Sequence, residues 1–480
     1  MTDNDSQYNS LAGFVYIFNL IVGAGALALP KAFSEAGLLL SAIIIVILAF
    51  LSFMTCSFMV EAMAIANAVL QQKEKAKIEN HEVNEKIETL QDESRTLLSN
   101  NAEINGQPSF EIRKKVEMGE MARMFFGKIG IRLFYLCIAV YLYGDLAIYA
   151  TAVPKSMRDV ICETSESSGN DSNNTNVSIS SSGQDDDKCC GLRRDDVYRI
   201  LVAAFAVLVC PFAFTNVQKT KYIQYLTTFL RWLCFSFMIV LALIHLGKGK
   251  GNGRPSVADF SGIPDLFGAS VYSFMCQHSL PSLITPLKSK KNVTTILFMD
   301  VGVALLFYSL LSFTALFTFV DSEIEDVYTL SFKHITSTGI STFLALYPVF
   351  ALSASFPIIS ITLRENLKAL FHKDDRKFPW IVDRIGFPLF AVLPPIVIAL
   401  STTNVEMLVS LTGSYAGVGV QYIIPTMLIV YGRQKAAEIL GFNDNDYGSF
   451  FKHRFWTWMI LSWTLLSVGV VTAYNIKKRI

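Results

Sequence analysis

Long apolar segments separated by polar loops dominate the pattern of residues along this chain. A run of about 20 apolar residues is long enough for a helix to cross the ~30 Å hydrocarbon core of a bilayer. We find eleven such runs, so the pattern predicts an all-α polytopic membrane protein with about eleven transmembrane helices. The runs span residues 11–30, 38–61, 130–153, 199–215, 222–246, 266–286, 294–319, 338–363, 383–401, 405–431 and 455–475.

The first run has two glycines near its centre, Gly23 and Gly25. Each costs roughly 1 kcal/mol relative to alanine in a helix interior. An unwound stretch within a membrane persists only where its backbone faces protein, a cavity or a ligand. The pattern therefore predicts a broken helix around Gly23, Ala24 and Gly25 that binds a solute or an ion. Alternatively, the glycines only allow another helix to pack closely.

The sixth run contains a similar interruption, where polar residues precede Pro281 and Pro286. Two interrupted helices five spans apart are typical of transporters built from two inverted repeats, with the substrate site where the broken helices meet. The exposed helix ends there offer amides to an anion and carbonyls to a cation. The residues predicted to bind substrate are Gly23, Ala24, Gly25, Ser273, Cys276 and His278.

The loops divide the chain into segments. We expect a cytosolic tail (1–10), a ten-helix transport core (11–431) with repeats 11–246 and 266–431, and an eleventh helix (455–475). The core includes a cytosolic insertion (62–129) and an outer loop (154–198). Within the insertion, residues 110–126 carry an apolar helical face, which lies either in the membrane interface or packed under the bundle.

Composition narrows the function. The chain is 52% hydrophobic and 17% charged, which is too apolar for an ordinary soluble domain. Its net charge of +1 offers no positive excess for nucleic acid. It has no glycine-rich phosphate loop and no metal-ligand spacing, so we predict neither an enzyme nor a bound cofactor or metal. The expected partners are the lipid bilayer and a small-molecule solute.

Glycosylation sequons set the predicted orientation, because Lys and Arg are divided almost evenly between the two sides. Three sequons lie in the 154–198 loop, which places that loop outside the cytosol. Their asparagines are Asn170, Asn173 and Asn176. The N-terminus is then cytosolic and the C-terminus extracellular or luminal, in a plasma or endolysosomal membrane. The sequon at Asn292 faces the cytosol and is expected to stay unmodified.

Three cysteines lie in the same loop region, on the oxidising side where disulfides persist. The predicted disulfide joins Cys162 to either Cys189 or Cys190.

A family resemblance rests on the two interrupted segments. NLIVGAGALALPKAF (19–33) resembles the first-helix signature of the amino acid/auxin permease family, and SFMCQHSLPSLITPL (273–287) resembles its sixth-helix segment. The resemblance covers the chain except residues 70–106 and the sequon-bearing loop. It implies a LeuT-like fold and secondary transport of amino acids or similar solutes by alternating access. A sensor or scaffold that binds solute without moving it is the alternative.

The resemblance also implies positions for a coupling ion. In sodium-coupled relatives, carbonyls of the first-helix break and hydroxyls of helix eight hold a cation. The matching positions are near Asn19 and Val22, with Ser353 and Ser355. The two serines can instead be ordinary back-bonded helix serines. Where some relatives carry an asparagine ligand, this chain has Ala26.

Two charged residues lie inside predicted spans, where charge is costly and usually functional. They are Asp145 and Arg231. Arg231 lies nine residues past Tyr222, which places it about 14 Å into the membrane. Its guanidinium either substitutes for a bound sodium or forms an ion pair with Asp145. Asp145 and His278 are candidates for carrying a proton, so coupling to protons or to sodium stays open.

Overall fold

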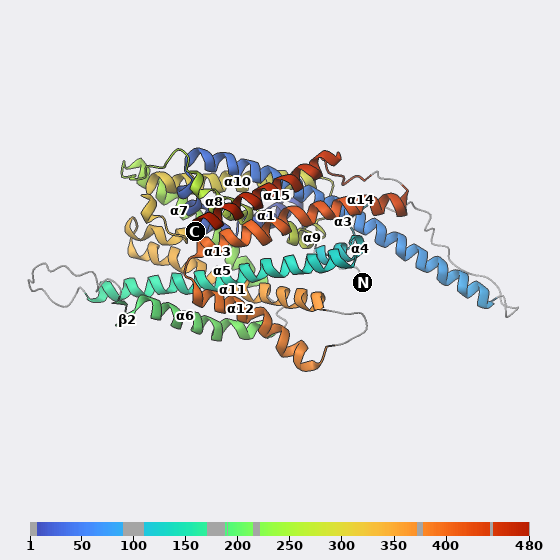
Figure 1. Cartoon of the computed structure of the whole chain (residues 1–480), viewed down its shortest axis with the longest axis horizontal. Coiled ribbons are helices and arrows are strands. Elements are labelled where there is room, and N and C mark those ends of the chain that lie inside the picture. Colours follow the sequence, from blue (N-terminus) through green and yellow to red (C-terminus); the bar gives the residue numbers. More distant parts are fainter. Residues whose placement is uncertain are drawn as a thin grey trace, which may run out of the picture.

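The computed structural model describes residues 7–89, 110–169, 188–189, 191–214, 221–371, 378–441 and 445–479. This part of the chain is almost entirely helical, and its long helices run roughly side by side (Figure 1). Its only strands form a short antiparallel hairpin of β1 (Lys188–Cys189) and β2 (Leu192–Arg193). The all-α class predicted from the sequence is therefore confirmed.

Nine helical segments of the described chain are long and apolar enough to cross a membrane. Each begins within a few residues of a predicted span. Six of them are the helices α3 (Leu38–Thr89), α5 (Lys128–Gly169), α7 (Lys221–Gly247), α10 (Val293–Thr318), α11 (Thr338–Phe371) and α15 (Arg454–Arg479). The other three are composite: α6 (Arg194–Val209) with η2 (Cys210–Phe214), η7 (Val382–Gly386) with α12 (Phe387–Ser401), and α13 (Val405–Leu411) joined through η8 (Thr412–Gly417) and η9 (Gly419–Ile423) to α14 (Ile424–Leu440).

The helix predicted for residues 11–30 is divided into α1 (Ser10–Ile21) and α2 (Gly25–Ala36), which are bent by 53° from each other. Val22 leaves the helical region with a ψ of 78°, and the Gly23 amide bonds back to the carbonyl of Ile21. Counted as one span, this pair raises the number to ten.

The predicted sixth span is also divided, into α8 (Ile263–Ser273), η4 (Gln277–Ser279) and α9 (Leu280–Ile284). Each piece is too short to cross a membrane alone. Backbone bonds between Tyr8 and the residues after α9 tie the start of α1 to this segment, and α2 packs along α8. The two interrupted segments therefore contact each other on both sides of their breaks, α2 with α8 and α1 with α9.

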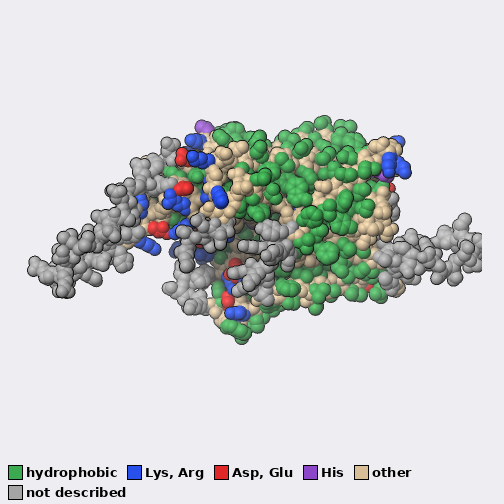
Figure 2. Space-filling view, turned by 180° about the vertical axis from the view of Figure 1, so that it is seen from behind, with side chains coloured by type: hydrophobic (Ala, Val, Ile, Leu, Met, Phe, Trp, Pro, Cys, Tyr) green, Lys and Arg blue, Asp and Glu red, His purple; other side chains and the backbone are tan. Residues whose placement is uncertain are grey.

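The bundle has two ends, and we name one after the N-terminus and the other after the disulfide. The N-terminal face holds the start of α1, the end of α9 and α4 (Met118–Phe125), whereas the disulfide face holds the ends of α2 and α5 and the starts of α8 and α13 (Figure 1). Figure 2 shows a broad hydrophobic band between ends where charged side chains gather. Exposed apolar residues of the described chain include Leu136, Leu208, Leu393 and Leu465. A band of this kind is typical of a surface that faces lipid.

The segment before α4 packs against the bundle. Ile112 and Val116 before α4 and Met121 within it are buried, and α4 contacts α3, α5 and α14. The buried Asn67 of α3 accepts the backbone amide of Lys114 at 2.8 Å and donates to its carbonyl at 3.1 Å. This arrangement matches packing under the bundle, not insertion into the membrane interface.

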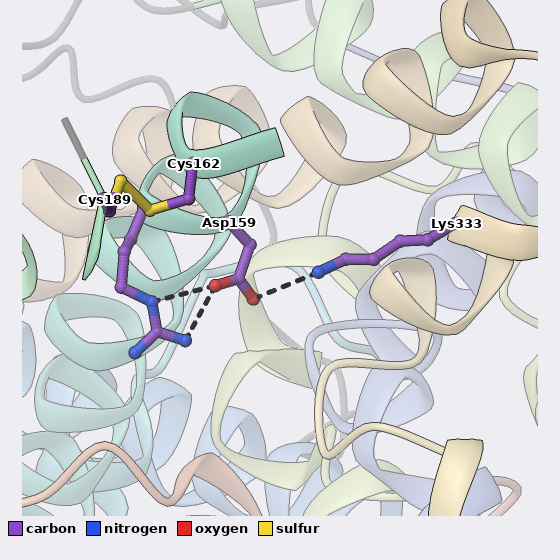
Figure 3. Close-up of a disulfide and its surroundings, with 5 residues drawn as sticks. Asp159, Cys162, Cys189 and Lys333 are labelled. Carbon is purple, nitrogen blue, oxygen red and sulfur yellow. Dashed lines mark hydrogen bonds and ion pairs between the residues drawn. A yellow bond between two sulfur atoms is a disulfide. The ribbon is translucent and has the colours of Figure 1, made fainter. Parts of the chain in front are cut away.

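A disulfide joins Cys162, near the end of α5, to Cys189 of the hairpin (Figure 3). Beside it, Asp159 accepts from Arg158 at 2.7 Å and lies 3.6 Å from Lys333 of η6 (Tyr328–His334). These contacts fix the end of α5 to a neighbouring segment. Cys190 and the three sequons of this loop lie outside the described residues.

Candidate functional site

A cavity of about 290 Å³ lies where the two interrupted segments meet. Residues of the α1–α2 break, α5, α7, α8, η4 and α11 line it. The cavity therefore touches both interrupted segments and three of the long helices around them.

The backbone at the break offers hydrogen-bond donors to this cavity. Among the described residues, the amides of Ala24 and Gly25 have no acceptor, because the turn before α2 ends the hydrogen bonding of α1. Amides at the start of a helix favour an anion through the helix dipole. The hydroxyl of Tyr308 lies 2.8 Å from the Ile21 carbonyl and 3.0 Å from that of Ser273, which holds the two breaks together.

Two lining side chains contribute further unpaired polar atoms. Neither polar atom of the buried Asn19 side chain has a partner in the described chain, nor does Nδ1 of His278. Buried polar groups are normally hydrogen-bonded, so a cluster of unpaired ones beside a cavity indicates a ligand or bound water.

Arg231 of α7 reaches the same cavity and donates from Nη1 to the backbone carbonyl of Asn19. Asp145 of α5 instead accepts a hydrogen bond from the Tyr272 hydroxyl. The ion pair between Arg231 and Asp145, one of the two alternatives from the sequence, is therefore wrong for this conformation.

A row of polar and aromatic side chains on α5 forms one wall. Tyr141, Asp145 and Tyr149 are four residues apart, so they project from one face of the helix. The Tyr141 ring centroid lies 5.6 Å from that of His278 and 6.3 Å from that of Tyr272. Sequence reasoning singled out Asp145 and missed the tyrosines, although their spacing of four was a usable signal.

The predicted substrate residues separate into two groups. Gly23, Ala24, Gly25 and His278 line the cavity. Ser273 and Cys276 are buried behind it: the Ser273 hydroxyl donates to the Ala269 carbonyl, and the Cys276 sulfur lies 3.3 Å from that of Cys56.

The predicted ion-coupling residues also divide. Asn19, Asp145, Arg231 and Ser355 line the cavity, whereas Val22 and Ser353 are not among its lining residues. The Ser355 hydroxyl donates to the Ala351 carbonyl at 3.0 Å, which is ordinary helix back-bonding.

The two glycines of the break have different surroundings. A Cβ atom added to Gly23 would meet nothing closer than 3.9 Å, whereas one added to Gly25 would lie 2.4 Å from the Ser273 hydroxyl and 2.7 Å from its Cα. Gly25 is therefore a close-packing contact between α2 and α8, and Gly23 is the glycine with open space beside it.

The cavity continues toward the N-terminal face. A second cavity of about 590 Å³ shares Tyr141, His278 and Thr362 with it and extends to α4, including Glu120 and Arg123. The two cavities therefore adjoin on the side of the N-terminal face.

Comparison with known proteins decides the family. A family model described as transmembrane amino acid transporter protein matches residues 7–473. The chain belongs to this family. It is 47% identical to mouse transmembrane protein 104, with 100% of the chain and 98% of that relative covered. Identity is 41% to the Drosophila melanogaster homolog of that protein (97% and 96% covered) and 34% to the Dictyostelium discoideum homolog (97% and 97%). These matches confirm the family suggested by the two interrupted segments.

Proposed function

We propose that this protein is a secondary transporter of an amino acid or a similar small solute, with a LeuT-like core of two inverted five-helix repeats. Alternating access would operate around the α1–α2 break and the α8–α9 break. The observation that carries the proposal is the cavity of about 290 Å³ at these breaks, with unpaired amides and a carboxylate in its walls. Membership of the amino acid transporter family supports the solute class.

The cavity offers complementary groups to a zwitterion. The amides of Ala24 and Gly25 would bind the solute carboxylate, because helix N-termini favour anions. Asp145, on the opposite helix α5, would attract the ammonium group, assisted by the aromatic rings of Tyr141 and Tyr272. The small volume suits a compact solute, since pockets for drug-sized ligands measure about 300–1,000 Å³.

Arg231 is our candidate for the group that replaces a coupling sodium ion. Its guanidinium binds the Asn19 carbonyl, one of the positions where the family resemblance implies a sodium ligand. A fixed positive charge there disfavours a second cation. We therefore infer sodium-independent transport, with a proton carried by Asp145 or His278 as the alternative driving ion.

The proposed orientation places the N-terminal face in the cytosol and the disulfide face outside, in a plasma or endolysosomal membrane. It rests on the three sequons in the 154–198 loop and on the disulfide in the same region. In this orientation the adjoining cavity that extends to α4 lies on the cytosolic side.

The test is uptake of labelled amino acids into proteoliposomes, comparing wild type with Asp145→Asn and with Asp195→Asn. Asp195 is an exposed carboxylate in the first turn of α6 and serves as the matched control. We expect uptake by wild type and Asp195→Asn, and loss with Asp145→Asn. Saturable binding of an amino acid without uptake would refute transport and favour the solute sensor.

A further inference from the structure

A separate cavity of about 580 Å³ lies at the disulfide face, at the other end of the bundle from α4. The end of α2, the starts of α8 and α13, and the C-terminal helix α15 border it. Glu35, Asp265 and Glu406 line it, and no Lys or Arg is among its lining residues. This cavity is acidic and shares no residue with the proposed transport site.

Glu406 is the residue that points to a ligand. Its side chain is only 6% exposed, and its Oε1 has no hydrogen-bond partner in the described chain. Glu35, Asp265 and Asp326 lie near enough to repel its charge, and Lys31 lies near enough to attract it. A buried carboxylate oxygen without a partner is costly. No group of the described chain donates a hydrogen bond to this oxygen, so a bound cation would stabilise it.

The nearby charges are engaged elsewhere. Asp326 is paired with Lys155 and accepts the backbone amide of Val405 at 2.8 Å. The ammonium group of Lys31 donates to the backbone carbonyl of Asp321 at 3.2 Å. Neither interaction supplies Glu406 with a partner, so a cation from solution would fill that role.

The walls favour an organic cation over a metal ion. In the part of the chain that the structure describes, no three acidic, His or Cys side chains are close enough to chelate a metal. Met407, Leu411 and Ile476 provide apolar surface instead. The Tyr415 ring also lines the cavity, and its hydroxyl accepts from Thr472 of α15 at 3.2 Å. An aromatic face and apolar walls beside a carboxylate suit an alkylammonium group.

We propose that this cavity binds a small organic cation with a short apolar body, such as an alkyl diamine, with one ammonium group on Glu406. The helix α15 completes the site by closing the cavity against α13. The site is independent of the proposed transport function, because it uses none of the residues around the α1–α2 break.

The experiment measures thermal unfolding of the full-length protein in detergent against 1,5-diaminopentane, with 1,5-pentanediol and sodium chloride of matched ionic strength as probe controls. We expect the diamine alone to raise the midpoint. Glu406→Gln should weaken diamine binding by about tenfold or more, since a hydrogen bond to a charged group contributes roughly 1.5–3 kcal/mol. Asp321→Asn is the matched control, because Asp321 is exposed on the same face and does not line the cavity.

A second variant tests the site independently, so that the proposal stays testable even when Glu406→Gln does not fold. Ile476 is 54% exposed, so Ile476→Lys should fold normally while placing an internal ammonium group at the cavity. We expect it to abolish the diamine effect. The proposal is overturned by an equal shift with sodium chloride or 1,5-pentanediol, or by no shift of the wild-type midpoint with the diamine. An unchanged diamine response in Glu406→Gln would also overturn it.

Discussion

Replacing Arg231 with alanine tests the coupling proposal most directly. In the structure its Nη1 donates to the Asn19 carbonyl at the α1–α2 break, and its buried Nε has no hydrogen-bond partner in the described chain. The alanine variant removes this charge from the cavity and leaves the Asn19 carbonyl without its donor. The variant therefore removes a charge and a hydrogen bond from the α1–α2 break while every residue of the break itself is kept.

The expected magnitude follows from the loss of the hydrogen bond to the Asn19 carbonyl. A hydrogen bond from a charged group contributes roughly 1.5–3 kcal/mol. At 1.36 kcal/mol per tenfold change, its loss should lower the uptake rate by about 10- to 150-fold. Arg231→Lys should retain more activity, because an ammonium group can still donate to one carbonyl although it lacks the planar fork.

The assay is initial-rate uptake into proteoliposomes with sodium or choline outside, with and without a pH gradient. Arg384→Ala is the control, since Arg384 is exposed and lies away from the cavity. Wild type should transport equally in sodium and choline. A strict sodium requirement in wild type, together with normal uptake by Arg231→Ala, would refute the reasoning and make the arginine structural.

Three further results are expected. Gly23→Ala should fold normally but reduce uptake, whereas Gly25→Ala should lower the thermal stability and yield of the purified protein, because its Cβ would collide with the backbone of α8. Asp300→Asn should not lower the unfolding midpoint, because both carboxylate oxygens of this fully buried residue lack partners in the described chain and the amide carries no charge. A glycosidase-induced mobility shift should disappear when the three loop asparagines are changed to glutamine; a shift that persists through Asn292 would overturn the orientation. Those asparagines are Asn170, Asn173 and Asn176.

The helices could be predicted closely because a run of 20 apolar residues is a local property of the sequence. The helix α3 shows the limit of this signal. The predicted span ended at residue 61, whereas the helix continues to Thr89. Its later residues are rich in Ala, Glu and Lys, which favour a helix through backbone propensity and not through hydrophobicity.

The site was predicted in part. The positions of the breaks followed from glycine and proline, and four of the six predicted substrate residues line the cavity. The partner of Arg231 could not be predicted, because it is a backbone carbonyl and every residue has one. The tyrosines on α5 were predictable in principle, since Tyr141 and Tyr149 flank Asp145 at intervals of four residues.

The first break also explains why the sequence left two interpretations of its glycines open. Close packing and ligand binding both favour a residue without a side chain, so the pattern is the same for either role. The position of the neighbouring helix distinguishes the two roles. The Ser273 backbone of α8 lies against Gly25, whereas the space beside Gly23 belongs to the cavity. The break therefore needs both glycines. Gly25 lets α2 pack closely against α8, and Gly23 leaves open space beside the unpaired amides of the break.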